Sequence, residues 1–175
     1  KWRELTMKVT DKYVFFWEGI FSNFYPCTIK YTFGDDELNF TTSEQFFMWL
    51  KAKSFGDEKI AEDILKAETP KEAKKLGRKV KYFNDEVWEE KRELAMEVVL
   101  RYKFSEQNPH LLKELLDSKY DNKTFVEASP FDTIWGIGMD EDNPNVEYES
   151  KWKGLNLLGK CINKIREEKL CNSKV

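Results

Sequence analysis

Hydrophobic and polar positions along this chain follow two periods, one typical of short strands and one typical of helices. Residues 13–17 are β-branched or aromatic without interruption, which predicts a short buried strand. Two further strands are expected over 28–31 and 38–40, and Gly34-Asp35-Asp36 between them predicts a hairpin. A last short strand is expected over 124–128.

Apolar residues at helical spacing dominate the rest of the chain. Besides the segment described next, helices are expected over 57–67, 70–77, 85–104, from 109 onward, and over 154–170. The pattern as a whole predicts an α+β fold, mainly helical with a few short strands. A length of 175 residues predicts one domain over 1–175, with its core at about 13–170.

The segment 41–53 is predicted to be a helix that is buried on most of its sides. Two overlapping capping boxes mark its start, Thr41 with Glu44 and Thr42 with Gln45. The residues that follow are mostly apolar, so little of the helix surface is left for solvent.

Two ionisable residues lie within this apolar segment. Glu44 and Lys51 are seven residues apart and share one helical face, about 10 Å apart along the axis at ~1.5 Å per residue. An acid and an amine on such a face are costly unless they are paired or used, so both are candidate catalytic groups. In the alternative interpretation Glu44 only caps the helix and the Lys51 stem only covers apolar surface.

The segment 129–138 reads Ser-Pro-Phe-Asp-Thr-Ile-Trp-Gly-Ile-Gly and has neither the helical nor the strand period. Its glycines allow a ligand to approach the backbone, so this aromatic loop is a functional candidate. The alternative is a packed turn. The acidic and polar segment 139–150 that follows predicts a mobile surface loop.

Composition sets bounds on the function. The net charge is −3, so the chain lacks the global basic surface that binds a long nucleic-acid duplex. One local basic cluster stands out: Lys74, Lys75, Arg78, Lys79 and Lys81. It is either a solvated helix face or a place where Arg78 contacts a ligand phosphate.

Histidine and cysteine usage argues against several kinds of site. The chain has one histidine and three cysteines, and no two cysteines have metal-ligand spacing. We therefore expect a reduced, cytoplasmic protein with no metal site. No apolar run approaches ~18 residues, so no membrane association is expected.

Several motifs, taken together and in order, resemble the NADAR family (NAD- and ADP-ribose-associated), which includes N-glycosidases. The segment Ser43-Glu44-Gln45-Phe46-Phe47 with Lys51 is similar to the signature helix of that family. The other matching motifs are Phe21-Ser22-Asn23-Phe24, residues 73–78, Trp88, Lys103-Phe104, residues 132–136 and residues 154–159. Each motif is short, but the ordered set runs from about residue 15 to residue 166.

The resemblance implies hydrolysis of a ribosyl N-glycosidic bond without a metal or redox cofactor. Substrate classes of the family are ADP-ribose attached to guanine in DNA or RNA, and phosphoribosylamino-pyrimidine intermediates of riboflavin synthesis. The first is the expected substrate here and the second is the alternative. Such a bond needs an acid for the leaving base, and an amine that attacks the sugar carbon C1 must be neutral, as apolar surroundings favour.

The resemblance also implies roles for single residues. Glu44 corresponds to the catalytic glutamate, Lys51 to the lysine that forms a Schiff base, and Asp132 to the loop aspartate. Asp132 is a catalytic candidate that either holds ribose hydroxyls or serves as a second acid/base. Substrate contacts are expected from Ser22, Asn23, Phe24, Arg78, Trp88, Trp135, Gly136 and Asn156. The chain has Ile137 after Gly136, where some members place an acid.

Two interpretations of other classes stay open at this point. The protein is either a module that binds ADP-ribose or NAD without cleaving it, or a structural protein that binds no ligand. The first uses the same pocket residues, and the second uses Glu44 only for stability.

Overall fold

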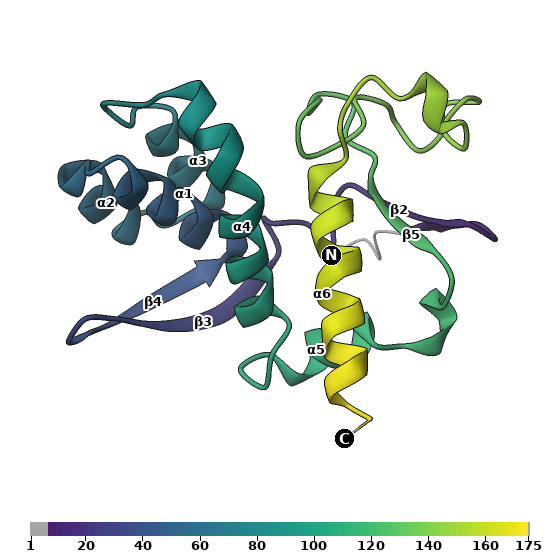
Figure 1. The fold of residues 1–175 in the computed structure, drawn as a ribbon, viewed down its shortest axis with the longest axis horizontal. Helices are drawn as coiled ribbons and strands as arrows, with labels where there is room; N and C mark the ends of the chain where they lie inside the picture. The colour runs from purple at the N-terminus through teal and green to yellow at the C-terminus, as the bar shows by residue number, and fades with distance from the viewer. Residues whose placement is uncertain (1–6, 175) are drawn as a thin grey trace. The chain divides into compact units, whose positions relative to one another are not determined.

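The computed structural model describes residues 7–174, which form six α-helices and two small sheets (Figure 1). The expected α+β class is therefore confirmed. The strands are β1 (Lys8–Val9), β2 (Tyr13–Phe16), β3 (Pro26–Phe33), β4 (Asp36–Thr42) and β5 (Thr124–Glu127). The helices are α1 (Ser43–Ser54), α2 (Glu58–Leu65), α3 (Pro70–Gly77), α4 (Asp85–Lys103), α5 (Pro109–Leu115) and α6 (Leu157–Asn172).

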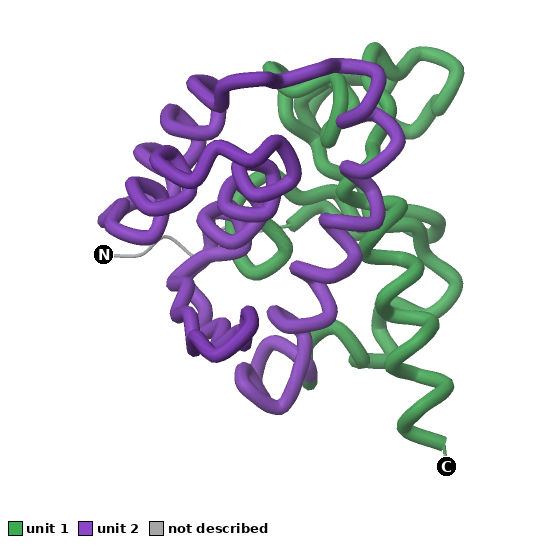
Figure 2. The backbone as a smooth tube through the Cα atoms, turned by 60° about the vertical axis from the view of Figure 1, so that its left-hand side comes forward, with its two compact units in different colours: residues 1–22, 113–175 green, residues 23–112 purple. Residues whose placement is uncertain are grey.

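Two compact units make up the structure (Figure 2). Unit 1 comprises residues 1–22 and 113–175, and unit 2 comprises residues 23–112. Unit 2 is one continuous stretch of chain, whereas unit 1 is assembled from both ends of the sequence. The expectation of a single domain over 1–175 stays a prediction.

Unit 2 is built on a hairpin and four helices. Strands β3 and β4 pair antiparallel, and α1 follows β4 directly (Figure 1). Phe46 of α1 stacks on Phe40 of β4 with ring centroids 4.6 Å apart, and it also meets Tyr31 and Tyr102. Such aromatic pairs add to the burial of apolar area, and they fix α1 against the hairpin.

The start of α1 is anchored by one glutamine. Thr42 is the N-cap and accepts a hydrogen bond from the Gln45 backbone N–H, while the Gln45 side chain accepts one from the Thr41 N–H. The amide group of Gln45 also donates to the Ile64 carbonyl at the end of α2. The predicted cap at Thr42 and Gln45 is therefore confirmed, and it ties two helices together.

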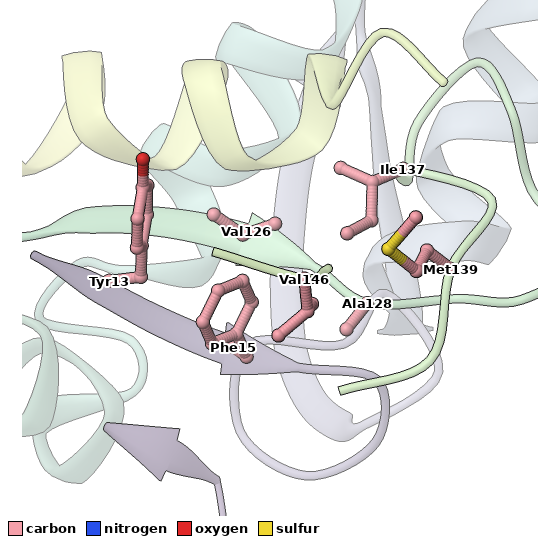
Figure 3. Close-up of a cluster of buried hydrophobic side chains, with 7 residues drawn as sticks. All are labelled: Tyr13, Phe15, Val126, Ala128, Ile137, Met139 and Val146. Carbon is pink, nitrogen blue, oxygen red and sulfur yellow. The ribbon is translucent and has the colours of Figure 1, made fainter. Parts of the chain in front are cut away.

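Unit 1 holds a three-stranded sheet in the order β1-β2-β5, with β2 and β5 parallel. Strand β1 was not predicted from the sequence, because a strand of two residues is too short to show an alternation of apolar and polar positions. A cluster of buried side chains covers this sheet (Figure 3): Tyr13, Phe15, Val126, Ala128, Ile137, Met139 and Val146. The prediction that 139–150 is a surface loop is wrong at Met139 and Val146, whose apolar side chains belong to the core.

Asparagine side chains at the start of α6 and within it form hydrogen bonds with the backbone of β5. The Asn156 amide accepts from the Glu127 N–H and donates to the Phe125 carbonyl, and Asn163 accepts from the Phe125 N–H. These asparagines bind the edge of β5 as a neighbouring strand would. Asn156 has a φ of +53°, which is why α6 begins at Leu157 and not at the predicted residue 154.

We predict that Gly159→Ala destabilises the protein, although alanine is the better helix former by ~1 kcal/mol. A Cβ at Gly159 would collide with the Phe125 carbonyl oxygen, so α6 must move away from β5. We expect the free energy of unfolding in urea to fall by about 3 kcal/mol. The exposed neighbour Lys160→Ala is the control and should change it by less than ~0.5 kcal/mol; equal effects would contradict the close approach.

Candidate active site

Glu44 and Lys51 both project from α1, the helix most enclosed in unit 2. Eight of its residues are buried: Ser43, Glu44, Gln45, Phe46, Phe47, Met48, Trp49 and Ala52. Glu44 lies in the first turn and is 7% exposed. Its backbone N–H donates to the Asn23 carbonyl at 3.0 Å, which brings the loop at 21–24 against the start of the helix.

Lys51 lies one turn before the end of α1 in partly apolar surroundings. Burial is the largest influence on its amine and lowers the pKa below the usual 10.5. The carboxylate of Glu44 is the second influence and raises the pKa, Arg78 lowers it, and Asp85 raises it by the smallest amount. The amine Nζ lies 4.6 Å from the centre of the Phe83 ring, which covers it on one side.

This environment supports the use of Lys51 as a nucleophile. A lysine with a lowered pKa has a larger neutral fraction at neutral pH, and only the neutral amine carries the lone pair that attacks carbon. The Glu44 charge acts on the amine across the shared helical face, as the seven-residue spacing predicts. The catalytic role of Lys51 stays a prediction, as does the alternative in which its stem only covers apolar surface.

Asn23 presents an unusual polar atom beside Glu44. The residue is 8% exposed, and its amide nitrogen lies 3.7 Å from the Met96 sulfur, a weak acceptor. Its side-chain oxygen Oδ1 is buried and has no hydrogen-bond partner within residues 7–174. An unpaired buried oxygen costs free energy unless a ligand satisfies it, so this amide is a candidate contact for a sugar hydroxyl.

Two cations of α3 lie close to this face. A Cβ at Gly77 would collide with the Met48 sulfur, so glycine permits the close packing of α3 on α1. The next residue, Arg78, caps the C-terminus of α3 and is exposed. Lys74 lies with its ammonium 5.8 Å from the centre of the Phe24 ring. Both side chains suit the phosphates of a nucleotide.

Trp88 is buried rather than presented to solvent. It is 7% exposed, and its ring packs against Phe47 at 5.4 Å and Phe55 at 6.1 Å between centroids. Phe55 in turn meets Phe83, the ring that covers the Lys51 amine. Trp88 therefore supports the wall around Lys51, and a direct substrate contact stays a prediction.

Asp132 organises the loop of unit 1. Its Oδ1 accepts hydrogen bonds from the backbone N–H groups of Ile134 and Trp135, at 2.9 and 2.8 Å. The Ser129 hydroxyl accepts from the N–H groups of Phe131 and Asp132. The loop is thus a series of side-chain-closed turns, and the second carboxylate oxygen, Oδ2, makes no hydrogen bond to residues 7–174.

Gly136 and Asn156 serve the packing of this loop. A Cβ at Gly136 would approach the carbonyl oxygens of Glu127 and Asp132 to 2.9 and 3.0 Å. Both ends of the Asn156 amide are bonded to β5, so we assign it a positioning role. Ser22 is buried in unit 1 with its N–H bonded to the Gly19 carbonyl. Substrate contacts by these residues stay predictions.

The expected site residues divide between the two units. Unit 2 brings together Asn23, Phe24, Glu44, Lys51, Arg78 and Trp88, and unit 1 holds Ser22, Asp132, Trp135, Gly136 and Asn156. Sequence reasoning missed Phe83 and Asp85, which both act on Lys51. The segment before the cap at Asn84 has no period, so only the fold reveals their proximity to the helix.

Metal-ligand groups and membrane-spanning helices were sought in the part of the chain that the structure describes. Within residues 7–174 no three histidine, cysteine, aspartate or glutamate side chains are grouped so that they could hold a metal ion. No helix among these residues combines the length and the apolar character needed to cross a bilayer.

Comparison with known proteins decides the family. The NADAR domain model matches residues 15–169. The chain belongs to the NADAR family. N-glycosidase R617 of Acanthamoeba polyphaga mimivirus is 42% identical over 168 residues, which cover 91% of this chain and 97% of that protein.

Two further proteins are similar to this chain. The N-glycosidase YbiA of Escherichia coli is 33% identical over 150 residues, and these cover 86% of this chain and 81% of YbiA. Its NMR structure matches with a TM-score of 0.72 and 28% identity, covering 98% of this chain and 92% of that one. The riboflavin biosynthesis protein PYRR of Zea mays is 31% identical over 158 residues, which cover 86% of this chain but 23% of that protein.

We predict that the Lys51 amine titrates below the usual lysine pKa of 10.5, because burial disfavours its charged form. Acetic anhydride labelling over a pH series, read by mass spectrometry, gives the midpoint for each lysine. Lys66 is the reference, since its partner Glu62 raises its pKa. Glu44→Gln should lower the Lys51 midpoint further, because a charge that raises the pKa is removed, whereas Glu62→Gln should leave it unchanged.

The same shift sets the sign of a stability effect. Between the lowered Lys51 pKa and 10.5 the unfolded chain binds more protons than the folded chain, so Lys51 makes the free energy of unfolding rise with pH. A Lys51 midpoint equal to or above that of Lys66 would contradict the assignment.

Proposed function

We propose that this NADAR protein is an N-glycosidase that removes ADP-ribose from guanine bases through a Schiff base on Lys51. The observation that carries the proposal is that α1 holds both a buried carboxyl group, Glu44, and the Lys51 amine, whose pKa is lowered by burial. Full-length relatives that are named N-glycosidases support the reaction class.

The first step breaks the bond to the base. The neutral Lys51 amine attacks C1 of the ribose, and the bond between C1 and the guanine nitrogen breaks with its electron pair leaving on the base. Glu44 takes the proton that the amine loses on attack and delivers it to the departing nitrogen. The product is a sugar joined to Lys51 by a C1–N bond, and the carboxylate returns to its starting state.

The second step releases the sugar. The C1–O bond to the ring oxygen breaks as the nitrogen lone pair forms the C=N bond of the Schiff base, and Glu44 carries the remaining proton of the Lys51 nitrogen to that oxygen, which becomes a hydroxyl group. Water then adds across the C=N bond, with its oxygen on C1 and one proton carried by Glu44 to the nitrogen. The C1–N bond breaks as the new hydroxyl group gives its proton to the nitrogen, which leaves an aldehyde on the sugar and the neutral Lys51 amine. One water is consumed for each base released, so the net reaction is hydrolysis.

The remaining residues bind and orient the substrate in this proposal. Asn23 Oδ1 accepts a hydrogen bond from a ribose hydroxyl, which satisfies its buried oxygen. Arg78 and Lys74 hold the pyrophosphate of ADP-ribose. Asp132, whose Oδ2 is not used by the loop, binds sugar hydroxyls or acts as a second acid/base, and Trp135 stacks on a base.

A second candidate substrate is a phosphoribosylamino-pyrimidine. Similarity to riboflavin biosynthesis protein PYRR favours it, because that protein contains a segment related to nearly all of this chain. Guanine carrying ADP-ribose is preferred because two cations, Lys74 and Arg78, suit a pyrophosphate better than a single phosphate.

We predict that the purified protein releases guanosine from ADP-ribosylated guanosine. The release is measured by chromatography. Lys51→Met keeps the length of the side chain but removes the amine, and the rate should fall at least ~10³-fold. Lys53→Met is the matched control on the same helix. That lysine is paired with Glu58 at 2.6 Å, and its replacement should leave the rate within about twofold.

The same assay with the phosphoribosylamino-pyrimidine decides between the substrates. If the protein turns over only that compound, the substrate assignment changes from ADP-ribosylated guanine to the pyrimidine, and the mechanism is unaffected. If calorimetry shows that ADP-ribose binds but neither substrate gives a product, the protein is a binding module and not an enzyme. Full activity of Lys51→Met would exclude the Schiff base.

We predict that Asn23→Ala lowers kcat/KM about tenfold, the effect of one lost hydrogen bond of ~1.4 kcal/mol. Because Oδ1 has no partner among the described residues of the free protein, the free energy of unfolding should change little. Steady-state kinetics and urea denaturation on the same samples check both. A large loss of stability with unchanged kcat/KM would give Asn23 a structural role only.

A further inference from the structure

Two reactive side chains that the proposed mechanism does not use lie together in unit 2, Cys27 on β3 and Lys103 at the end of α4. Lys103 is 0% exposed, and its Nζ lies 5.2 Å from the centre of the buried Phe104 ring. Cys27 is half-buried, so a small molecule can reach its sulfur. Lysine is seldom fully enclosed in a protein, and this amine therefore requires an explanation.

One asparagine brings the two segments together. The β3–β4 ladder is irregular over residues 26–29. The Asn108 side-chain oxygen accepts from the Thr28 N–H at 2.8 Å, and its nitrogen donates to the Thr28 carbonyl at 2.8 Å. The same nitrogen also donates to the Lys103 carbonyl at 3.0 Å. The backbone next to Cys27 is thereby held against the end of α4.

Each of the two groups changes the pKa of the other. Burial is the largest influence on the Lys103 amine and outweighs the Cys27 charge, so that its pKa falls to about 8. Burial also raises the pKa of the Cys27 thiol, against the opposing effect of Lys103. Both shifts favour the uncharged forms, a thiol beside a neutral amine. About a tenth of the Lys103 amine is then neutral at pH 7, far more than of a surface lysine.

A third buried group faces the sulfur. Ser43 is the first residue of α1 and is 0% exposed, and its hydroxyl oxygen makes no hydrogen bond to residues 7–174. The hydroxyl and the backbone N–H of Ser43 both lie close enough to Cys27 to lower the pKa of the thiol. An unsatisfied hydroxyl at a helix N-terminus suits an oxygen atom added to this sulfur, because both features stabilise negative charge.

We propose that Cys27 and Lys103 form a reversible covalent bridge between sulfur and nitrogen when the protein meets hydrogen peroxide. Three groups that this reaction requires are in place: an accessible sulfur, an enclosed amine beside it, and the Ser43 hydroxyl for the oxygen of the intermediate. A sulfenic acid condenses with a nitrogen nucleophile held next to it, and the fixed contact at Asn108 keeps that nucleophile close.

The first step oxidises the sulfur. The Lys103 amine takes the proton of the Cys27 thiol, the thiolate attacks one oxygen of hydrogen peroxide, and the O–O bond breaks. The hydroxide that leaves takes the proton back from Lys103. The products are a sulfenic acid on Cys27, one water and the neutral amine.

The second step joins the two side chains. The Lys103 nitrogen attacks the sulfur, the S–O bond breaks, and the departing hydroxide takes a proton from the nitrogen to form a second water. Two molecules of a thiol reverse the bridge. The first forms a mixed disulfide with Cys27 and returns a proton to the freed amine, and the second releases the Cys27 thiol as a disulfide of the reductant forms.

This inference goes beyond the proposed function, and the bridge forms without any substrate. Its place in the fold gives it a consequence for the site, because Ser43 at the sulfur directly precedes Glu44 in α1. A bridge between β3 and α4 at this point would shift the start of the helix that carries the proposed acid. The pair is therefore a modification site through which peroxide controls the position of Glu44.

The test treats the full chain with hydrogen peroxide in modest excess, cleaves it after glutamate and identifies the products by mass spectrometry. The expected product joins peptide 19–37 to peptide 98–106 and carries two hydrogen atoms fewer than the separate peptides. Dithiothreitol should restore both peptides.

Lys103→Met keeps the length of the side chain but removes the amine. No linked peptides should form, and Cys27 should pass to the irreversible sulfinic acid, so the thiol recovered with dithiothreitol falls at least about fivefold. Lys30→Met replaces an exposed lysine on the same strand and should react as the wild type does. Cys27→Ser should also give no linked peptides, and it provides the comparison if Lys103→Met fails to fold.

Three results would each overturn the bridge. These are wild-type Cys27 that stays a thiol or becomes a sulfinic acid without a link to Lys103, a linked product in Lys103→Met, and equal thiol recovery from Lys103→Met and the wild type.

The effect on the site is measured with ADP-ribosylated guanosine. Peroxide should lower the rate at least about threefold in the wild type, because a small displacement of a catalytic group slows the reaction. Dithiothreitol should restore the rate, and Cys27→Ser should not respond. A bridge with an unchanged rate would retain the modification site and reject its control of Glu44. Turnover without any bridge would retain the glycosidase and reject the modification site, and a bridge in a protein without turnover would do the reverse.

Discussion

The central constraint in this protein is the position of the Lys51 amine, because burial there lowers its pKa. The cost of burying the amine is partly offset by Glu44, whose charge raises the pKa again from the same helical face. The balance leaves an amine with a larger neutral fraction than a surface lysine and a carboxyl group for proton transfer. Covalent attack on a sugar carbon requires both groups, so the proposed chemistry depends on this one helix.

The packing around α1 maintains that balance. Aromatic contacts between Phe46, Phe40 and Tyr31 hold the helix on the hairpin, and Gly77 lets α3 approach Met48 closely. Arg78 then acts on Lys51 with a charge that favours the neutral amine. A cation that binds substrate phosphate would thus also lower the pKa of the nucleophile, until the bound anion cancels part of that effect.

Residue patterns predicted the elements well and the loops less well. The α3 bounds and the Thr42 cap followed from local signals, because caps and prolines act over four residues. The face shared by Glu44 and Lys51 followed from helix geometry alone. Contacts between distant segments were not predictable: Phe83 over Lys51 and Val146 in the core depend on chain reversals that leave no period.

The most direct measurement is reduction of the reaction mixture with borohydride, which converts a Schiff base into a stable amine, followed by peptide mapping. With ADP-ribosylated guanosine as substrate, the account predicts that the mass of the reduced ADP-ribose moiety appears on the peptide containing Lys51 and is absent from Lys51→Met. Turnover by the wild-type protein with no trapped adduct, or an adduct on another lysine such as Lys53 or Lys103, would contradict it.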